Sequence, residues 1–482
     1  MTCSENWRRY GNEKTAYCYR KRIAVSMMKY QWIFYNILPI IGFFLAMTLL
    51  VHQNREQRSP SSTVAGLLAI LLVPYLGVPA YILFGGRKTK RRTKNKADLA
   101  LDIKVSGEPL ITQDSGAIFP LRADNSIALL ATGEKACAAL LDLIEHAVKS
   151  IDISTYILGN DATGDAILAA LTRKALQGVR VRLLLDALGS FRVTARMLSP
   201  LRAGGGQCAF FMPMMHLPFQ GRANLRNHRK IIIVDNAAAM LGGMNIAREY
   251  MGTAPNKLRW HDLSFIVKGS VVIDLLHVFR SDWQFASKQK IAPQDATAAA
   301  ETGATTALQL VPSGPDVAGD PFFDSILTAL FKARSRVWIA TPYFIPDEML
   351  LKALCITARR GIDVRIVVPK VSNHRLADLV RRSFLRQIQD SGATICYFTP
   401  GMMHGKVILV DSTLGIVGSM NMDIRSFFLN YEIALFIYNE KTVQELDSWM
   451  TDLMSQSVNY IKKANVIVGF LEGVARLLSP LL

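Results

Sequence analysis

The sequence predicts an α/β protein of two related lobes, preceded by a two-helix transmembrane hairpin. Two observations support this: a similar order of apolar segments occurs twice, and two long uncharged apolar stretches precede the first copy. The chain has 482 residues, half of them hydrophobic, so it is long enough for more than one domain and more apolar than most soluble enzymes. The duplicated order predicts two α/β sandwich lobes whose sheets meet about a pseudo-twofold axis.

The first 86 residues predict a membrane anchor. Residues 1–30 form a basic tail, and residues 31–86 contain two apolar stretches, Trp32 to Val51 and Val64 to Phe84. Each has roughly the 20 residues that a helix needs to cross a bilayer. A signal peptide is the alternative for the first stretch. It is disfavoured because the run is long, the second run follows closely, and no small-residue cleavage site separates them.

Basic residues flank this hairpin on its outer sides. They are Arg20, Lys21, Arg22 and Lys29 before it, and Arg87, Lys88, Lys90, Arg91, Arg92, Lys94 and Lys96 after it. The loop between the stretches holds only Arg55 and Arg58 against Glu56. The positive-inside rule then places the rest of the chain at the cytoplasmic face. The net charge of +18 is concentrated beside the expected membrane, which favours anionic lipid over nucleic acid as partner.

The remainder divides into five segments. They are a basic juxtamembrane linker (87–117), a first lobe (118–290), a connector (291–307), a second lobe (308–465) and an apolar C-terminal segment (466–482). In each lobe the pattern predicts helix, strand, helix, strand and then a β-hairpin. The C-terminal segment is expected either to lie in the membrane interface or to pack onto the second lobe.

A pattern of polar residues occurs once in each predicted lobe. The two segments read HRKIIIVDNAAAMLGGMN and HGKVILVDSTLGIVGSMN. They share His228, Lys230, Asp235 and Asn245 in the first copy and His404, Lys406, Asp411 and Asn421 in the second. Gly243 stands where the second copy has Ser419. Two complete copies predict that paired groups from both lobes converge on one site.

The apolar runs after the two lysines predict strands. Because strand side chains alternate, the histidine and lysine of each copy are expected to point to one face, so that both pairs line one cleft. Asp235 and Asp411 have the opposite parity and fall at predicted turns. We assign these aspartates mainly to bracing the turns, with direct contact to substrate as the alternative. Tyr156 and Tyr343, at matching places after the first strands, line the cleft or lie in the core.

These residue types suit a phosphodiester. Positioned lysines neutralise charge on its oxygens, and Asn245, Ser419 and Asn421 offer further hydrogen bonds. A neutral imidazole needs a group behind it that fixes its second nitrogen. Asp262 in RWHDLSF and Glu432 in NYEIALF occupy comparable places downstream of the motifs. We expect them to orient the histidines, with solvated strand-edge acids as the alternative.

The repeated pattern resembles the HKD signature of the phospholipase D superfamily. From about residue 31 to its end the chain resembles bacterial cardiolipin synthases of the phospholipase D type. This implies phospholipase D-type lobes in a multi-pass protein of the bacterial inner membrane. It also implies transfer of a phosphatidyl group from one phosphatidylglycerol to another, with release of glycerol and no cofactor or metal. The resemblance favours His228 as nucleophile and His404 as general acid/base.

Three other functions stay open from the sequence alone. A hydrolytic phospholipase D could use the same residues if water entered the site. An HKD nuclease would need a path for a polyanion and has little use for a two-span anchor. A non-enzymatic scaffold would require both motifs to be relics, although both keep histidine, lysine, aspartate and asparagine.

Overall fold

The computed structural model describes residues 119–213, 225–289, 291 and 303–459, with a few single residues near both ends. The chain separates into two compact units, Met1–Arg87 and Lys88–Leu482, and every strand and helix named below belongs to the second. The predicted tail, both apolar stretches, the basic linker and most of the connector lie outside the described residues. Of the helices in the described part, none combines the length and apolarity needed to cross a membrane.

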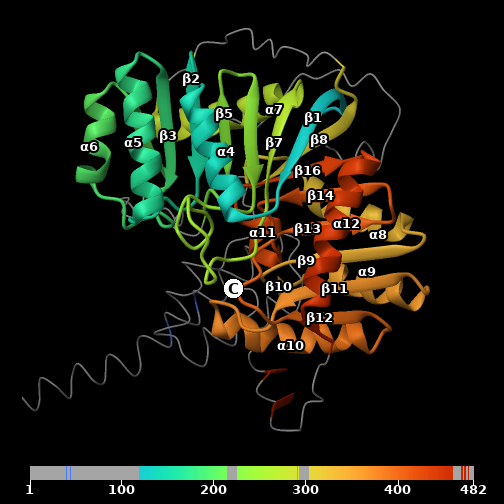
Figure 1. The fold of residues 1–482 in the computed structure, drawn as a ribbon. Helices are drawn as coiled ribbons and strands as arrows, with labels where there is room; N and C mark the ends of the chain where they lie inside the picture. Colours follow the sequence, from blue (N-terminus) through green and yellow to red (C-terminus); the bar gives the residue numbers. More distant parts are fainter. Residues whose placement is uncertain are drawn as a thin grey trace, which may run out of the picture. The chain divides into compact units, whose positions relative to one another are not determined.

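The first half alternates strands and helices before its hairpin (Figure 1). Its elements are β1 (Arg122–Leu130), α4 (Gly133–Glu145), β2 (Ser150–Thr155), α5 (Ala162–Leu176), β3 (Arg180–Asp186), α6 (Ala195–Ala203), β4 (Gln207–Phe211), β5 (Ile231–Val234), β6 (Ala238–Gly242), β7 (Ser264–Gly269) and α7 (Val271–Ser287). The predicted helix, strand, helix, strand order corresponds to α4 to β3, and the predicted hairpin to β5 and β6.

The second half repeats this order. Its elements are β8 (Thr306–Ser313), α8 (Pro321–Lys332), β9 (Arg336–Ala340), β10 (Phe344–Ile345), α9 (Glu348–Arg359), β11 (Asp363–Pro369), α10 (Arg375–Gln389), β12 (Thr394–Phe398), β13 (Val407–Val410), β14 (Leu414–Gly418), β15 (Met422–Asp423), α11 (Ile424–Phe428), β16 (Glu432–Ile437), α12 (Glu440–Ser455) and β17 (Ser457–Val458). The α/β class is therefore confirmed, with the same connectivity used twice.

Among the described residues, fifteen strands from both halves form one sheet, and β10 pairs with β15 apart from it. The order of the large sheet is β17-β12-β11-β9-β13-β14-β16-β8-β1-β7-β6-β5-β2-β3-β4. Reading outward from the central β8–β1 pair, the two halves have matching orders, which is the arrangement of a pseudo-twofold repeat. The two sheets expected to meet about a pseudo-twofold axis are joined edge to edge through β1 and β8 into a continuous sheet. Antiparallel pairing of β1 with β8 satisfies backbone groups that two free edges would leave unpaired.

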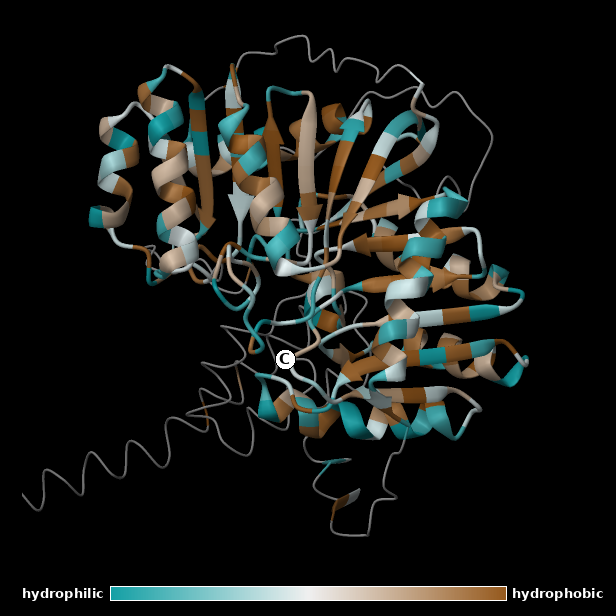
Figure 2. Cartoon of the chain, viewed as in Figure 1, coloured by the Kyte–Doolittle hydropathy of each residue, from teal (hydrophilic) through white to brown (hydrophobic). Residues whose placement is uncertain are grey.

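Helices cover both faces of the sheet, and their ends are set by local sequence. Asp161 accepts hydrogen bonds from the backbone of Thr163 and Gly164 at the start of α5, and Asp347 caps α9 through the N–H of Met349. These side chains satisfy N–H groups that a helix start leaves without partners. The hydropathy colouring of Figure 2 shows brown apolar strands between helices that carry teal residues on their outer sides.

Three apolar cores hold the layers together. One lies under α4, α5 and α6 of the first half and one under α8, α9 and α10 of the second. The third is shared, because it joins residues of α7 with residues of α12 and strands of both halves. In the C-terminal segment, Glu472 pairs with Arg386 of α10, and the Arg476 guanidinium lies 4.5 Å from the ring centre of Phe384. These contacts are those of packing onto the second half.

Candidate active site

Backbone hydrogen bonds between the halves bring the two histidine segments together. The N–H of His228 donates to the carbonyl of Tyr431 at 2.9 Å, and the N–H of Tyr431 donates to Arg226 at 2.9 Å. In the same way, the N–H of His404 donates to the carbonyl of His261 at 2.7 Å. Each histidine segment therefore pairs with the residue before an acid of the opposite half. This crossing sets which acid each imidazole meets.

The two histidines are held by carboxylates in a crossed arrangement. Nδ1 of His228 lies 3.0 Å from Oε2 of Glu432, and Nδ1 of His404 lies 2.6 Å from Oδ2 of Asp262. Both acids are completely buried, and the imidazole side chains are 12% and 5% exposed respectively. With Nδ1 directed at a carboxylate, each ring keeps Nε2 for chemistry.

Backbone hydrogen bonds of the residues that follow the two acids are the same in both halves. Asp262 precedes Leu263, whose carbonyl accepts from the N–H of Gly243 at 3.0 Å, and Glu432 precedes Ile433, whose carbonyl accepts from Ser419 at 3.0 Å. The places of Asp262 and Glu432 in their halves are thus equivalent. Their surroundings differ, because the Ser419 hydroxyl donates to Oε2 of Glu432 whereas position 243 has no side chain.

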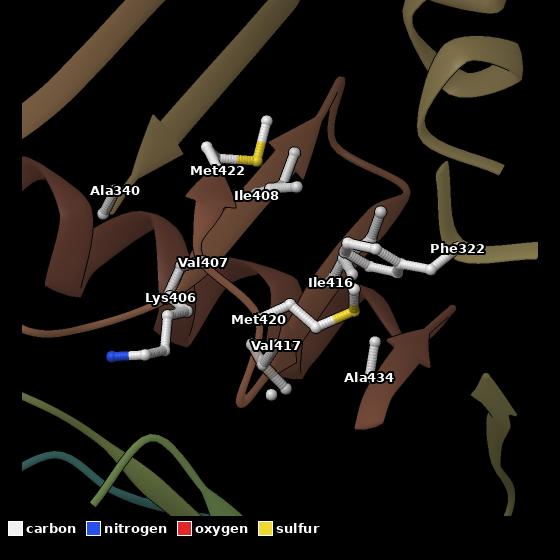
Figure 3. A pocket seen from close by; sticks show the side chains of 11 residues that line it. Phe322, Ala340, Lys406, Val407, Ile408, Ile416, Val417, Met420, Met422 and Ala434 are labelled. Carbon is white, nitrogen blue, oxygen red and sulfur yellow. The ribbon is translucent and has the colours of Figure 1, made fainter. Parts of the chain in front are cut away.

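Two buried lysines accompany the histidines. Nζ of Lys230 donates to the carbonyl of His228 at 2.7 Å, while Nζ of Lys406 donates to the carbonyl of His404 and lies 2.8 Å from Nδ1 of that ring. Figure 3 shows the Lys406 amine extending away from an apolar pocket that Ile408 and Met420 help to line. The ammonium groups are therefore directed to the polar side of these strands.

Burial shapes the charge states of the site. It lowers the pKa of Lys230 to about 7 and that of Lys406 to about 8, although nearby carboxylates oppose the change. Burial also lowers the pKa of His404 well below its usual value, and the positive charges of Lys406, Lys230 and His228 lower it further. Groups from both halves thus lie close enough to influence one another's protonation.

The pKa values of the two buried carboxylates shift in opposite directions. Burial raises the pKa of Asp262 to about 6 against the effects of Lys406 and the Leu263 N–H. Burial alone would raise the pKa of Glu432 too, but the charges of His228 and Lys230 and the hydrogen bond from Ser419 bring it below its ordinary value. Its surroundings therefore favour the ionised form of Glu432, whereas the pKa of Asp262 is raised to about 6.

The three residues expected to bind phosphate, Asn245, Ser419 and Asn421, differ in how their side chains are hydrogen-bonded. Asn245 accepts from the N–H of Ile157 through Oδ1 at 3.2 Å, while its Nδ2 and the Oδ1 of Asn421 are buried with no hydrogen-bond partner. Both amides keep capacity for a further hydrogen bond. The Ser419 hydroxyl is instead used by Glu432, so we assign it to positioning that acid and not to contact with phosphate.

Asp235 and Asp411 lie in the turns of the two hairpins, after β5 and β13. Asp235 accepts from the backbone N–H groups of Val148, Lys149 and Ser150, at 2.6 to 2.8 Å. Asp411 accepts in the same manner from residues 334–336 and from the Ser335 hydroxyl. Both have φ of 53°, a left-handed conformation that aspartate tolerates. These contacts fit bracing of the turns, the first of the two roles considered.

Sequence reasoning did not assign Arg229, the residue between His228 and Lys230. Its guanidinium is fully buried, pairs with Asp282 at 2.8 Å and Asp316 at 3.2 Å, and donates to the carbonyl of Glu432 at 3.0 Å. The arginine therefore ties the first motif to the acid of the second half. An arginine between the histidine and lysine of the motif, just before an apolar strand, was the available signal, but its partners are 53 and 87 residues away.

In the described part of the chain, His404 has more aromatic neighbours than His228. The ring of Tyr156 lies 5.1 Å from that of His228, measured between centroids. His404 has three such neighbours, Tyr250 at 5.0 Å, Trp260 at 5.1 Å and Tyr343 at 6.4 Å. The sequence suggested the two tyrosines at the strand ends as cleft residues, and both are within ring contact of a histidine. Tyr250 and Trp260 were not anticipated.

The fold and the paired histidine-lysine groups define a phospholipase D-type enzyme. The family model described as "Cardiolipin synthase, PLD-like domain" matches residues 140–283 and 326–454. Accordingly, the chain belongs to the cardiolipin synthase family of the phospholipase D superfamily.

Individual relatives agree with this membership. Cardiolipin synthase 1 of Bacillus cereus is 33% identical over 460 residues, covering 89% of this chain and 90% of that protein. Cardiolipin synthase of Geobacillus thermodenitrificans is 33% identical over 454 residues, with the same coverage. Among solved structures, phosphatidylserine synthase of Haemophilus influenzae superposes with a TM-score of 0.59 at 16% identity, covering 77% of this chain and 99% of that one, which shows a shared fold.

Proposed function

We propose that this protein is a membrane-bound phosphatidyltransferase that makes cardiolipin from two molecules of phosphatidylglycerol and releases glycerol. The observation that carries the proposal is the crossed pair of histidine–carboxylate contacts, His228 with Glu432 and His404 with Asp262. This arrangement presents two imidazole Nε2 atoms from different halves beside two buried lysines. Family membership supplies the lipid substrate and product.

In the first step, Nε2 of His228 attacks the phosphorus of one phosphatidylglycerol. The bond from phosphorus to the glycerol oxygen breaks, and the proton shared by the His404–Asp262 pair passes through Nε2 of His404 to that oxygen, so that glycerol leaves and a phosphatidyl-histidine remains. The higher exposure of the His228 side chain, 12% against 5% for His404, supports its role as the nucleophile. Lys230 and Lys406 neutralise charge on the phosphate oxygens.

In the second step, a hydroxyl of the second phosphatidylglycerol attacks the same phosphorus. Its proton passes to His404, the bond from phosphorus to His228 breaks, and cardiolipin is released with both imidazoles restored. One phosphodiester replaces another, so no nucleotide is consumed. The stable negative charge of Glu432 supports the cation that His228 becomes while it carries the phosphatidyl group.

Two neighbouring activities differ only in the acceptor or the substrate. Water in place of the second lipid hydroxyl would give a hydrolytic phospholipase D. A nucleic-acid diester in place of the lipid would give a nuclease. Membership of the cardiolipin synthase family favours a lipid acceptor over both.

The membrane arrangement is part of the same proposal. We place two transmembrane helices within residues 31–86 and the two lobes, 118–290 and 308–465, at the cytoplasmic face of a bacterial inner membrane. The uncharged stretches Trp32 to Val51 and Val64 to Phe84 and their basic flanks support this topology. Accessibility of single cysteines to an impermeant reagent in intact cells would test it. Labelling of residues in both lobes from outside would contradict it.

The reaction is tested with the detergent-solubilised full chain and phosphatidylglycerol vesicles. Cardiolipin and glycerol should appear in equal amounts, and phosphatidic acid without cardiolipin would instead identify a hydrolase. His228→Ala and His404→Ala should each abolish turnover, leaving only a level below about one thousandth of wild type. Mass spectrometry of the trapped adduct should place the phosphatidyl group on His228. An adduct on His404 would reverse the two roles.

A further inference from the structure

Exposed large apolar side chains gather where loops leave the strands that lead to the histidines. They are Leu188 and Phe191 after β3, Leu258 before β7, Met349 at the start of α9, and Val371 and Leu376 after β11. Phe191 is 65% exposed and Leu258 is 86% exposed. We call these six residues the rim surface. The active-site edge of each half is the one at the carboxyl ends of its parallel strands, because β5 and β13 begin there.

Contacts link the rim surface of the first half to His228. The hydroxyl of Ser190, which lies between Leu188 and Phe191, donates to the carbonyl of Tyr156 at 2.9 Å. The ring of Tyr156 then lies 5.1 Å from that of His228. The exposed apolar residues of this loop are therefore separated from the nucleophile by one tyrosine.

Two similar links lead to His404. Leu258 lies two residues before Trp260, whose ring is 5.1 Å from that of His404. On the opposite side, Asn373, between Val371 and Leu376, accepts a hydrogen bond of 2.6 Å from the Tyr343 hydroxyl, and the Tyr343 ring lies 6.4 Å from the His404 ring. Three rim loops thus approach the reacting groups from both halves.

The charge around these residues has one predominant sign. In the stretches 187–196, 246–258, 346–349 and 370–376 the acidic residues are Glu348, which is exposed, and Glu249 and Asp347, which are half-buried, and Glu249 pairs with Arg248. The exposed basic residues there are Arg192, Arg196, Arg248, Lys257, Lys370 and Arg375. The Arg192 guanidinium lies 5.4 Å from the ring centre of Phe191, so a cation and an exposed aromatic ring share one position. Mixed basic and apolar side chains are typical of surfaces that rest in the interface of an anionic bilayer.

We infer that the rim surface docks onto the surface of an anionic lipid bilayer and inserts Phe191 and Leu258 among the lipid headgroups. This inference rests on the proposed function and adds to it the place where the site meets its substrate. A lipid whose headgroup reaches the histidines can then keep its acyl chains in the bilayer. The same seal limits entry of water to the phosphatidyl-histidine, which favours transfer over hydrolysis.

The structure provides matched controls. Leu176 at the end of α5 is 71% exposed, and Phe331 near the end of α8 is 53% exposed. Both precede β3 or β9 and so lie at the opposite end of the parallel strands. They resemble the rim residues in size and exposure but are remote from the histidines. If the rim surface docks onto lipid, substitutions in it should change lipid contact and activity, whereas substitutions of Leu176 and Phe331 should not.

The first test measures whether lipid acyl chains contact position 191 but not position 176. Phe191→Trp and Leu176→Trp of the full chain are reconstituted into vesicles of phosphatidylcholine and phosphatidylglycerol, with or without brominated acyl chains. The fluorescence of the tryptophan added at 191, taken as the difference from wild type, should fall at least twofold with brominated lipid, whereas that added at 176 should not change. Equal quenching at both positions, or none at 191, would overturn the inference. If quenching of the tryptophan at position 191 depended on the amount of protein per vesicle and not on bromination of the lipid, it would indicate contact between copies of the chain. That result would also overturn the inference.

The second test compares two presentations of substrate. The double variant Phe191→Ser with Leu258→Ser should turn over long-chain phosphatidylglycerol in vesicles roughly tenfold more slowly than wild type, because two apolar side chains no longer enter the interface. It should keep wild-type rates on soluble dihexanoyl phosphatidylglycerol. Leu176→Ser with Phe331→Ser should keep both rates. Equal losses on both substrates would overturn docking, whereas a wild-type enzyme inactive on both would overturn the proposed function itself.

Discussion

The two halves hold their histidines with different pairs of residues. His228 meets Glu432, whose carboxylate also accepts from the Ser419 hydroxyl and, at 3.0 Å, from Nδ2 of Asn430. His404 meets Asp262, which accepts from the N–H of Leu263 at 2.8 Å. At the position of Ser419 the first half has Gly243. The pseudo-twofold repeat therefore conserves the backbone arrangement and changes the acid together with its neighbour.

The difference has a steric origin. A Cβ on Gly243 would lie 2.2 Å from Oδ1 of Asp262, so the carboxylate occupies the space that a side chain would need. The longer Glu432 extends past the equivalent position and leaves room for Ser419, whose hydroxyl then adds a hydrogen bond. The charge and hydrogen bond of His228, the charge of Lys230 and the hydrogen bond from Ser419 lower the pKa of Glu432 and keep it ionised, whereas burial raises the pKa of Asp262 to about 6. The first acid suits a histidine that becomes a cation, and the second suits one that exchanges protons.

The largest effect is expected from neutralising either acid. Glu432→Gln and Asp262→Asn should each lower kcat on phosphatidylglycerol by about 10²- to 10⁴-fold, because an amide does not hold the reactive imidazole tautomer. A phosphatidyl nitrophenyl ester separates the two roles, since its leaving group needs no proton. Burst kinetics should show rapid nitrophenol release by Asp262→Asn and none by Glu432→Gln. The reverse pattern would exchange the roles of the two halves.

The second largest effect is expected from filling the space at position 243. Gly243→Ser should reduce kcat by about 10²-fold, since even its Cβ displaces the Asp262 carboxylate that fixes His404. The matched change in the other half, Ser419→Gly, creates no overlap and should be much milder. Thermal unfolding of both variants checks that the loss is local. Full activity of Gly243→Ser would show that Asp262 need not remain where it is.

The pH profile distinguishes the lysines of the two halves. Activity should fall towards acid pH, where His228 takes up a proton and no longer attacks phosphorus, and this limb should lie below the usual range of an imidazole because burial lowers the pKa of His228. It should also fall above about pH 7, where Lys230 loses its proton before Lys406, whose pKa is about 8. Each limb should approach a tenfold change per pH unit. In initial rates from pH 5 to 9, Lys230→Arg should move the alkaline limb upward, and an unmoved limb would assign it to another group.

A smaller effect is expected from the serine that supports Glu432. Ser419→Ala should lower kcat by roughly tenfold, because a hydrogen bond to a buried charged group contributes about 1.5–3 kcal/mol. The loss should deepen as pH falls, since Glu432 becomes easier to protonate. Ser419→Thr keeps the hydroxyl and serves as the control. A pH-independent loss would indicate a direct role in phosphate binding.

The least effect on activity is expected from the turn aspartates. Asp235→Ala and Asp411→Ala should leave kcat within about twofold but lower the free energy of unfolding by about 1–3 kcal/mol, because exposed and partly buried backbone N–H groups lose a charged acceptor. Asp411 should be the more sensitive, since it also accepts from the Ser335 hydroxyl. Chemical denaturation measures the difference. A loss of activity at unchanged stability would favour direct contact with substrate.

Much of this molecule follows from local sequence. The β-branched runs after Lys230 and Lys406 predict the hairpin strands, and the repeat predicts the α/β class, because side-chain periodicity reflects the nearest turn or strand. The comparable places of Asp262 and Glu432 after the motifs are also readable from spacing. These features depend on residues a few positions apart, so one sequence contains the necessary information.

Only the tertiary structure decided how the halves exchange partners. His228 meets an acid 204 residues away and His404 one 142 residues away, through backbone bridges at Tyr431 and His261 that no local pattern encodes. The assignment of Ser419 to Glu432 and the burial of Arg229 between two aspartates were hidden for the same reason. Each depends on which strands of a fifteen-stranded sheet lie side by side, and strand order is a property of the whole fold.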